Sequence, residues 1–88
     1  MKRRYLEVTF RKGKPLAAYL YLPREPGVKS ARTEKVGRGL LVDYSQAGHP
    51  IGLEITAPGE ISLEEINKAL ESIGQPILEP EELAPLAA

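Results

Sequence analysis

The clearest pattern in the chain runs from Gly39 to Ile55, where two apolar runs flank a short polar segment that contains glycine. Apolar and polar residues alternate in both runs, which predicts two β-strands joined as a hairpin. The apolar residues of the two strands must share one sheet face, so the numbers of opposed residues add to an odd value. A register with Val42 opposite Ile51 and Leu40 opposite Leu53 satisfies this condition. The inward-facing residues are Leu40, Val42, Tyr44, Ile51, Leu53 and Ile55.

A second hairpin is predicted nearer the N-terminus. Residues 5–10 and 16–22 both alternate, and the segment between them contains glycine and proline as turn residues. Pairing Phe10 with Leu16 directs the apolar residues of both strands toward the core. The residues predicted to face the core are Leu6, Val8, Phe10, Leu16, Ala18, Leu20 and Leu22.

Residues 62–73 carry the strongest helix signal. Ser62 and Glu65 have the spacing of a capping box, and Gly74 is placed to end the helix. A single apolar stripe predicts that the helix packs on the core face of the sheet. The tail, residues 76–88, either frays or docks through Leu83 and Leu86 on its own subunit or on a neighbour.

These elements predict one α+β domain, with the sheet in residues 1–56, the helix in 62–73 and the tail in 76–88. The two hairpins supply a four-stranded, mainly antiparallel sheet, and the C-terminal helix covers one face. The polar segment 28–36 between them is extended and resembles a short edge strand. One short helix covers only half of such a sheet, which leaves apolar area near Phe10, Leu16 and Leu20. We therefore expect a homodimer or a higher homo-oligomer.

Composition narrows the class of protein. The 88 residues include no cysteine, and 42% are apolar and 27% charged, as in ordinary globular domains. The chain has no apolar run of the roughly 18 residues that a membrane helix needs, and its basic N-terminus lacks the apolar stretch of a signal peptide. We expect a cytoplasmic protein with no membrane partner.

The formal net charge of +0 conceals an asymmetry. Residues 1–38 hold eleven Lys and Arg against three Glu, a balance of +8, and residues 39–88 hold one Lys against nine acids, a balance of −8. Three interpretations stay open. The charges are solvated on separate elements, or they form a basic surface for an anionic partner, or the two halves attract each other within or between chains.

Two segments carry a family resemblance. Ala31-Arg-Thr-Glu-Lys-Val, followed by Gly39-Leu-Leu-Val-Asp-Tyr, a glycine-containing turn and Gly52-Leu-Glu-Ile, resembles the signature of the family called domain of unknown function 2283. The similarity spans roughly residues 5–56. Family members are usually rich in Asp at the hairpin turn, whereas residues 45–49 here contain none, so the resemblance does not imply metal binding. The family has no established activity, and some members look like the smaller protein of a toxin–antitoxin-like pair, which implies an antitoxin-like role.

Few residues are candidates for catalysis. His49 is the only histidine and lies in the predicted hairpin turn, where we expect it to be exposed. In the register given above, Asp43 lies opposite Pro50 and Glu54 opposite Gly39, too far apart for a carboxylate pair of about 5–10 Å. We therefore expect no catalytic residue, no metal ligand and no cofactor.

More residues are candidates for binding a partner than for catalysis. Arg32, Glu34 and Arg38 lie in or beside the family-like segment, and Arg forms paired hydrogen bonds with carboxylate or phosphate. Tyr19 and Tyr21, with Tyr5, lie on the outer face of the first hairpin, either as a cross-strand aromatic cluster, as an oligomer contact or as a stacking platform for bases.

The leading functional hypothesis is a non-enzymatic protein-interaction module, including an antitoxin-like one. The alternatives are nucleic-acid binding through the basic N-terminal half together with the tyrosines, and an enzyme of unknown class.

Overall fold

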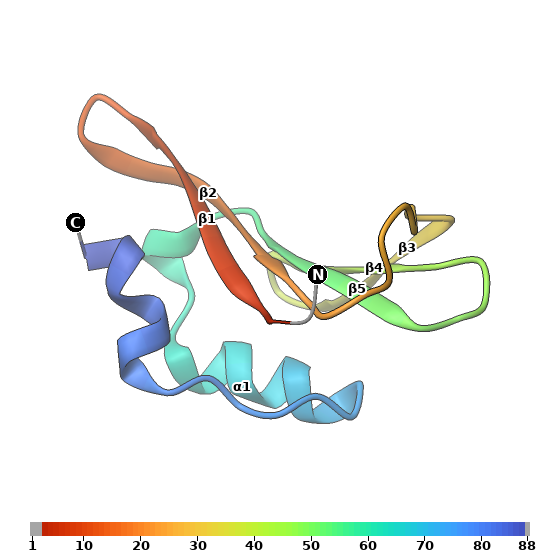
Figure 1. The fold of residues 1–88 in the computed structure, drawn as a ribbon. Coiled ribbons are helices and arrows are strands. Elements are labelled where there is room, and N and C mark those ends of the chain that lie inside the picture. Colours follow the sequence, from red (N-terminus) through yellow and green to blue (C-terminus); the bar gives the residue numbers. More distant parts are fainter. Residues whose placement is uncertain (1–2, 88) are drawn as a thin grey trace.

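The computed structural model describes residues 3–87, and side chains for residues 3–85. One antiparallel sheet with the strand order β1-β2-β5-β4-β3 lies over one α-helix and the C-terminal segment (Figure 1). The α+β class is confirmed. The strands are β1 (Tyr5–Arg11), β2 (Lys14–Tyr21), β3 (Arg32–Gly37), β4 (Leu40–Tyr44) and β5 (Pro50–Ile55). They are followed by the 3-10 turn η1 (Pro58–Glu60), the helix α1 (Leu63–Ser72) and the 3-10 helix η2 (Pro80–Ala87).

The sheet has five strands, so the prediction of four is wrong by one. The additional strand is β3, which begins at Arg32 and pairs with β4 at the sheet edge. Its first four residues are all exposed. An edge strand exposed on both faces needs no apolar alternation, and this explains why the sequence pattern gave only a weak signal for it.

The central hairpin has the predicted faces but a different register. Val42 lies opposite Leu53 and Leu40 opposite Ile55, two residues away from the predicted partners. The numbers of these partners still add to an odd value, and all four side chains are buried. Ile51 is an extra residue, a β-bulge beside the turn, and pattern alone does not predict where a bulge occurs.

The N-terminal hairpin follows its prediction at one end only. Leu6 pairs with Leu20 and Val8 with Ala18, as expected. A register shift after Thr9 then places Phe10 opposite Pro15, while β5 extends along β2 only as far as Ala18. Phe10 and Leu16 are 41% and 51% exposed, so their predicted core positions are wrong, whereas the prediction of uncovered apolar area near them is confirmed.

Helix α1 begins and ends at the predicted signals. Ser62 accepts a hydrogen bond from the backbone N–H of Glu65, and the Glu65 carboxylate accepts one from the backbone N–H of Ser62. Gly74 has a positive φ of 75°, and the next N–H, of Gln75, bonds back to the carbonyl of Leu70. This pattern is a Schellman C-cap, which only glycine adopts without strain.

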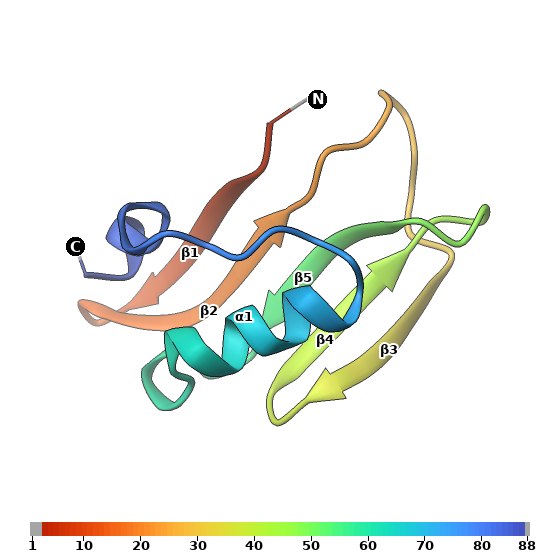
Figure 2. The same cartoon turned by 90° about the horizontal axis from the view of Figure 1, so that it is seen from below.

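Residues 76–87 of the tail do not fray but return beneath β1 and β2 (Figure 2). Asn67 accepts a hydrogen bond from the N–H of Leu78 and donates one to its carbonyl, and Leu78 is 1% exposed. Arg4 donates to the carboxylate of Glu82 and to two tail carbonyls. Leu83 packs against the core, and the Leu86 side chain lies outside the described part of the chain.

The tail covers part of the apolar sheet face that was expected to favour an oligomer. Leu20 is 1% exposed, so the prediction that it lies in an uncovered apolar area is wrong. Leu78 and Leu83 belong to the same core, beneath the half of the sheet that α1 leaves free. The buried cluster consists of Ala18, Leu20, Leu22, Leu40, Val42, Leu53, Ile55, Ile66, Ala69, Leu70 and Leu78.

Candidate functional site

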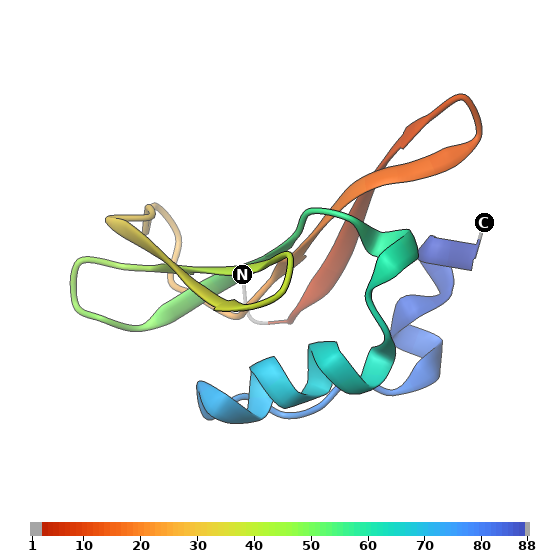
Figure 3. The same cartoon turned by 180° about the vertical axis from the view of Figure 1, so that it is seen from behind.

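The face of the sheet opposite α1, here called the outer face, is covered by no helix among residues 3–87 (Figure 3). One line of residues crosses all five strands on this face: Tyr5, Tyr21, Gly52, Asp43 and Thr33 are successive ladder partners. Strands that are distant in sequence therefore present aromatic and polar groups side by side on a surface open to solvent.

The centre of this line is a hydrogen-bonded network. The Tyr19 hydroxyl donates to one carboxylate oxygen of Asp43 at 2.6 Å, and the Thr33 hydroxyl donates to the other. Tyr19 reaches Asp43 by lying over Gly52, where a Cβ would collide with its ring and hydroxyl. Burial and the hydrogen bond to Asp43 raise the pKa of the Tyr19 hydroxyl far above its ordinary value, so it stays protonated.

The three tyrosines Tyr5, Tyr19 and Tyr21 form a packed group, here called the tyrosine cluster. The rings of Tyr5 and Tyr21 stack with centroids 4.6 Å apart, and Tyr19 meets Tyr21 edge-on at 4.7 Å. The guanidinium of Arg24 lies 5.5 Å from the Tyr21 ring, and the Tyr21 hydroxyl donates to Glu7. Tyr5 remains 51% exposed, so the cluster offers an aromatic surface to a partner.

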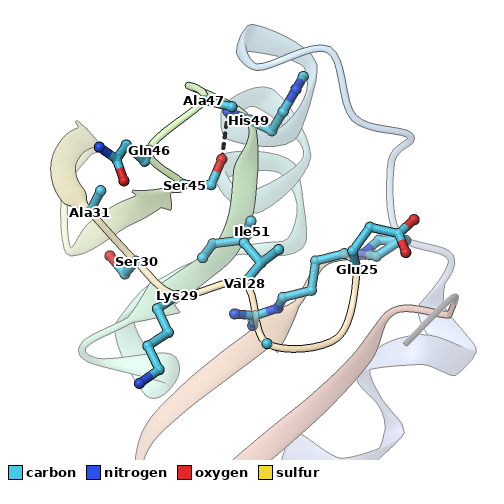
Figure 4. Close-up of a pocket in the computed structure, with 13 residues that line it drawn as sticks. Glu25, Val28, Lys29, Ser30, Ala31, Ser45, Gln46, Ala47, His49 and Ile51 are labelled. Carbon is cyan, nitrogen blue, oxygen red and sulfur yellow. Dashed lines mark hydrogen bonds between the residues drawn. The ribbon is translucent and has the colours of Figure 1, made fainter.

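A groove of about 860 Å³, lined in part by Arg24, lies near the tyrosine cluster. Figure 4 shows the residues that line it. It lies between the β2–β3 loop, residues 22–31, and the β4–β5 turn, residues 45–49. Figures 1 and 3 show this loop on the side of the sheet away from α1. Val28 and Ile51 are apolar lining residues, although Ile51 is only 2% exposed, and Arg24 belongs both to the groove and to the surroundings of Tyr21. The groove and the cluster are therefore parts of one surface.

The five predicted binding residues do not form one site. Tyr19 and Tyr21 lie together on the outer face, as predicted. Arg32 and Glu34 lie on the opposite face of β3, where they pair with each other at 2.6 Å. Arg32 also lies 4.4 Å from the ring of Tyr44, whose neighbours belong to the core.

Arg38 makes contacts within the chain, although its side chain is 65% exposed. It donates to the backbone carbonyl of Glu60 and to the carboxylate of Glu65, and so ties the β3–β4 turn to α1. The backbone N–H of Ser62, and then Arg38, lower the pKa of Glu65. Arg4 and Glu82 join the basic and acidic halves of the chain in the same way. Two of the three ion pairs among residues 3–87 thus support attraction between the halves within one chain.

The carboxylates Asp43 and Glu54 are closer than predicted. Asp43 lies opposite Gly52 and Glu54 opposite Leu41, so the two are diagonal neighbours on the outer face, at a typical Cα separation of about 7–8 Å. The expectation that they lie far apart is therefore wrong. Each oxygen of Asp43 nevertheless accepts a hydrogen bond from a hydroxyl group, which holds the carboxylate between Tyr19 and Thr33.

His49 is exposed in the β4–β5 turn, as predicted, and its ring points away from Ile51 (Figure 4). Its backbone N–H donates to the Ser45 hydroxyl at 3.2 Å. Within residues 3–87, no three His, Cys, Asp or Glu side chains are arranged to hold a metal ion.

Three contributors to this surface were missed in the sequence: Gly52, Thr33 and Arg24. A lone glycine inside an alternating strand is itself a signal of close approach by another group, and Gly52 fits that signal. Thr33 has no comparable signal, because its contact with Asp43 depends on the β3–β4 register. Arg24 has none either, because the loop that brings it back over Tyr21, three residues earlier, follows no alternating pattern.

Comparison with known proteins identifies no relative of this chain. No family model, no curated protein and no solved structure matches the chain. The resemblance to the domain of unknown function 2283 family therefore stays a prediction. Among the described residues, no helix is both long and apolar enough to cross a membrane.

Proposed function

We propose that this chain is a non-enzymatic protein-interaction module that acts in the cytoplasm and binds its partner on the outer face. The observation that carries the proposal is the tyrosine cluster with Arg24, placed next to an open groove on an uncovered sheet face. Tyr and Arg are the residue types most enriched at the energetic centres of protein interfaces.

The rigidity of this surface favours the proposal. Tyr19 is held by Asp43 and Tyr21 by Glu7, so the rings lose little side-chain freedom when a partner binds. Tyr5 supplies the most exposed ring, and the groove offers space for a side chain of the partner. An antitoxin-like role, with a toxin as the partner, is the narrower form of this proposal and rests on the family resemblance alone.

Nucleic-acid binding has weaker support. Arg4, Arg32 and Arg38 form ion pairs with acids and lie away from the tyrosine cluster. The acids Glu7 and Asp43 lie directly beside the tyrosine hydroxyls and would repel a phosphate backbone. An enzymatic role has weaker support as well, because both oxygens of Asp43 already accept hydrogen bonds, from Tyr19 and Thr33.

The test is affinity purification of partners from a native lysate with the wild-type chain and two variants. Tyr5→Ala removes the exposed ring. Lys68→Ala is the control, because Lys68 is an exposed residue of α1 and lies away from the outer face of the sheet. We expect one stoichiometric protein to bind the wild type and Lys68→Ala, and to bind Tyr5→Ala at least about tenfold more weakly. Failure to find such a protein, or equal retention by both variants, would contradict the proposal.

A further inference from the structure

The tip of the β1–β2 hairpin combines positive charge with exposed apolar side chains. The tip, here called the basic tip, consists of Phe10, Arg11, Lys12, Lys14 and Leu16. All five are exposed, and no ion pair within residues 3–87 involves its three cations. Since β5 ends its pairing at Ala18, the hairpin projects beyond the rest of the sheet (Figures 1 and 3).

The tip is a defined structure rather than a loose loop. Lys12 and Gly13 have positive φ values of 53° and 77°, the combination required at both central positions of a type I′ turn. This turn matches the twist of the flanking strands, so it fixes the backbone positions that carry the three cations and the two apolar side chains.

A second surface has the complementary composition. Ile77 is 46% exposed, and the neighbouring Glu79 and Glu81 are exposed as well; these three residues are here called the acidic tail patch. Glu79 and Glu81 take part in no ion pair within the described part of the chain. The backbone around the patch is held by Arg4, which donates to the carbonyls of Pro76 and Ile77.

Both surfaces stay exposed within one chain because of their positions. The patch is anchored beside Arg4 at the start of β1, and the basic tip lies at the other end of the same strand. The 7 residues of β1 span about 23 Å at roughly 3.3 Å per residue. This distance is far beyond the Debye length of about 8 Å at physiological salt, so the two surfaces of one chain attract each other little.

We propose that this chain binds a second copy of itself, with the basic tip of one copy docked on the acidic tail patch of the other. The contact pairs Arg11, Lys12 and Lys14 with Glu79 and Glu81. It also buries Phe10 and Leu16 against Ile77, and these are three of the four exposed large hydrophobic residues. When each tip meets the partner's patch, the arrangement closes as a two-fold dimer. The outer face takes no part and remains free for a different partner.

The experiment measures molar mass against concentration by sedimentation equilibrium for the wild type and two charge-reversal variants. K12E/K14E makes the tip acidic, and E79K/E81K makes the patch basic. In either variant alone both contacts of the dimer become repulsive, so we expect self-association at least roughly tenfold weaker than in the wild type. Mixed together, the two variants restore attraction at both contacts, so we expect a mixed dimer with nearly wild-type affinity.

Two controls separate this contact from general charge effects. K29E/K35E changes net charge by the same amount as K12E/K14E but lies outside the tip, and it should associate like the wild type. Tyr5→Ala, on the outer face, should also associate normally, which separates this test from that of the proposed function. Circular dichroism of each variant establishes that it is folded.

Three results would overturn the proposal. The first is a wild type that stays monomeric at all concentrations. The second is a mixture of the two variants that fails to associate although each is folded. The third is equal weakening by K29E/K35E. Loss of binding to duplex DNA in K12E/K14E, with a monomeric wild type, would assign the tip to nucleic acid instead.

Discussion

Tyr19 occupies the space that a side chain at position 52 would need. Gly52 lies on β5 between the strands that carry Tyr19 and Asp43, and its missing Cβ lets the phenol cross the strand and reach the carboxylate. The hydrogen bond joins residues 24 positions apart in the chain. One glycine therefore permits the polar network that spans the centre of the outer face.

Gly52→Ala should destabilise the protein by about 1–3 kcal/mol, because the new methyl group forces Tyr19 away from Asp43. The free energy of unfolding in urea measures the effect. Gly59→Ala is the matched control, since a Cβ there meets nothing within 4 Å and the change should be nearly neutral.

The same substitution in a Tyr19→Ala background isolates the cause. Without the phenol, alanine at position 52 should be neutral or slightly stabilising, because it reduces the freedom of the unfolded chain. A full loss of stability in that background would show that the glycine is needed for a reason other than Tyr19.

Alkaline pH should weaken the fold through Tyr19. Its folded-state pKa is raised by burial and by the hydrogen bond to Asp43, so its contribution is complete below the unfolded pKa of 10.0. As pH rises above that value, the unfolded chain loses this proton and the folded chain keeps it, and stability falls. Unfolding measured across this range should show a shallower decline for Tyr19→Phe. Equal slopes for the two proteins would be inconsistent with this role.

Arg4→Ala should release the tail. Arg4 donates two hydrogen bonds to Glu82 and one each to the carbonyls of Pro76 and Ile77. Their loss should cost about 2 kcal/mol and increase amide hydrogen exchange in residues 76–83. Arg3→Ala is the control, because Arg3 is exposed and should change stability by less than about 0.5 kcal/mol. Unchanged exchange in the tail of Arg4→Ala would show that Leu78 and Asn67 suffice to hold it.

Acid should loosen the same contact. Arg4 first, and then the backbone N–H of Glu79, lower the folded-state pKa of Glu82 below 4.5. The stabilisation is present above the unfolded value and is lost as pH falls through the lowered folded value. Hydrogen exchange of the tail, corrected for the intrinsic rate, should therefore increase at acid pH. In Glu82→Gln it should be high already at neutral pH and change little with acid.

Ser62→Ala should destabilise α1 by about 1 kcal/mol, because it removes the acceptor for the Glu65 N–H. Ser62→Asp keeps an acceptor at the N-cap and should retain most of the stability. Thermal unfolding compares the two variants, and equal losses in both would mean that the cap contributes little.

The helix was predictable in detail because its signals are local. Ser62 and Glu65 are three residues apart, and Gly74 follows directly after the C-cap residue Ile73. The inward and outward faces of the strands were predictable for a similar reason, since alternation is a property of each strand alone.

The candidate surface was predictable only in part. Tyr19 and Tyr21 are two residues apart on one strand, so their shared face follows from the sequence. Their hydroxyl partners do not, because Asp43 reaches Tyr19 only across β5. The erroneous separation of Asp43 from Glu54 came from the β4–β5 register. Tyr44 pairs with Pro50, one residue away from the prediction, and the bulged residue Ile51 displaces the remaining pairs by one more.

The sequence by itself determined the start and end of α1, the α+β class, and the faces of the hairpins except at the tip of the first, since these depend on interactions among residues close in the chain. Tertiary structure alone decided the strand order, the β4–β5 register and the return of the tail beneath β1. It also decided the meeting of Tyr19 with Asp43 over Gly52. Each of these joins segments far apart in sequence, and the choice among them depends on which arrangement buries apolar surface while pairing every buried polar group.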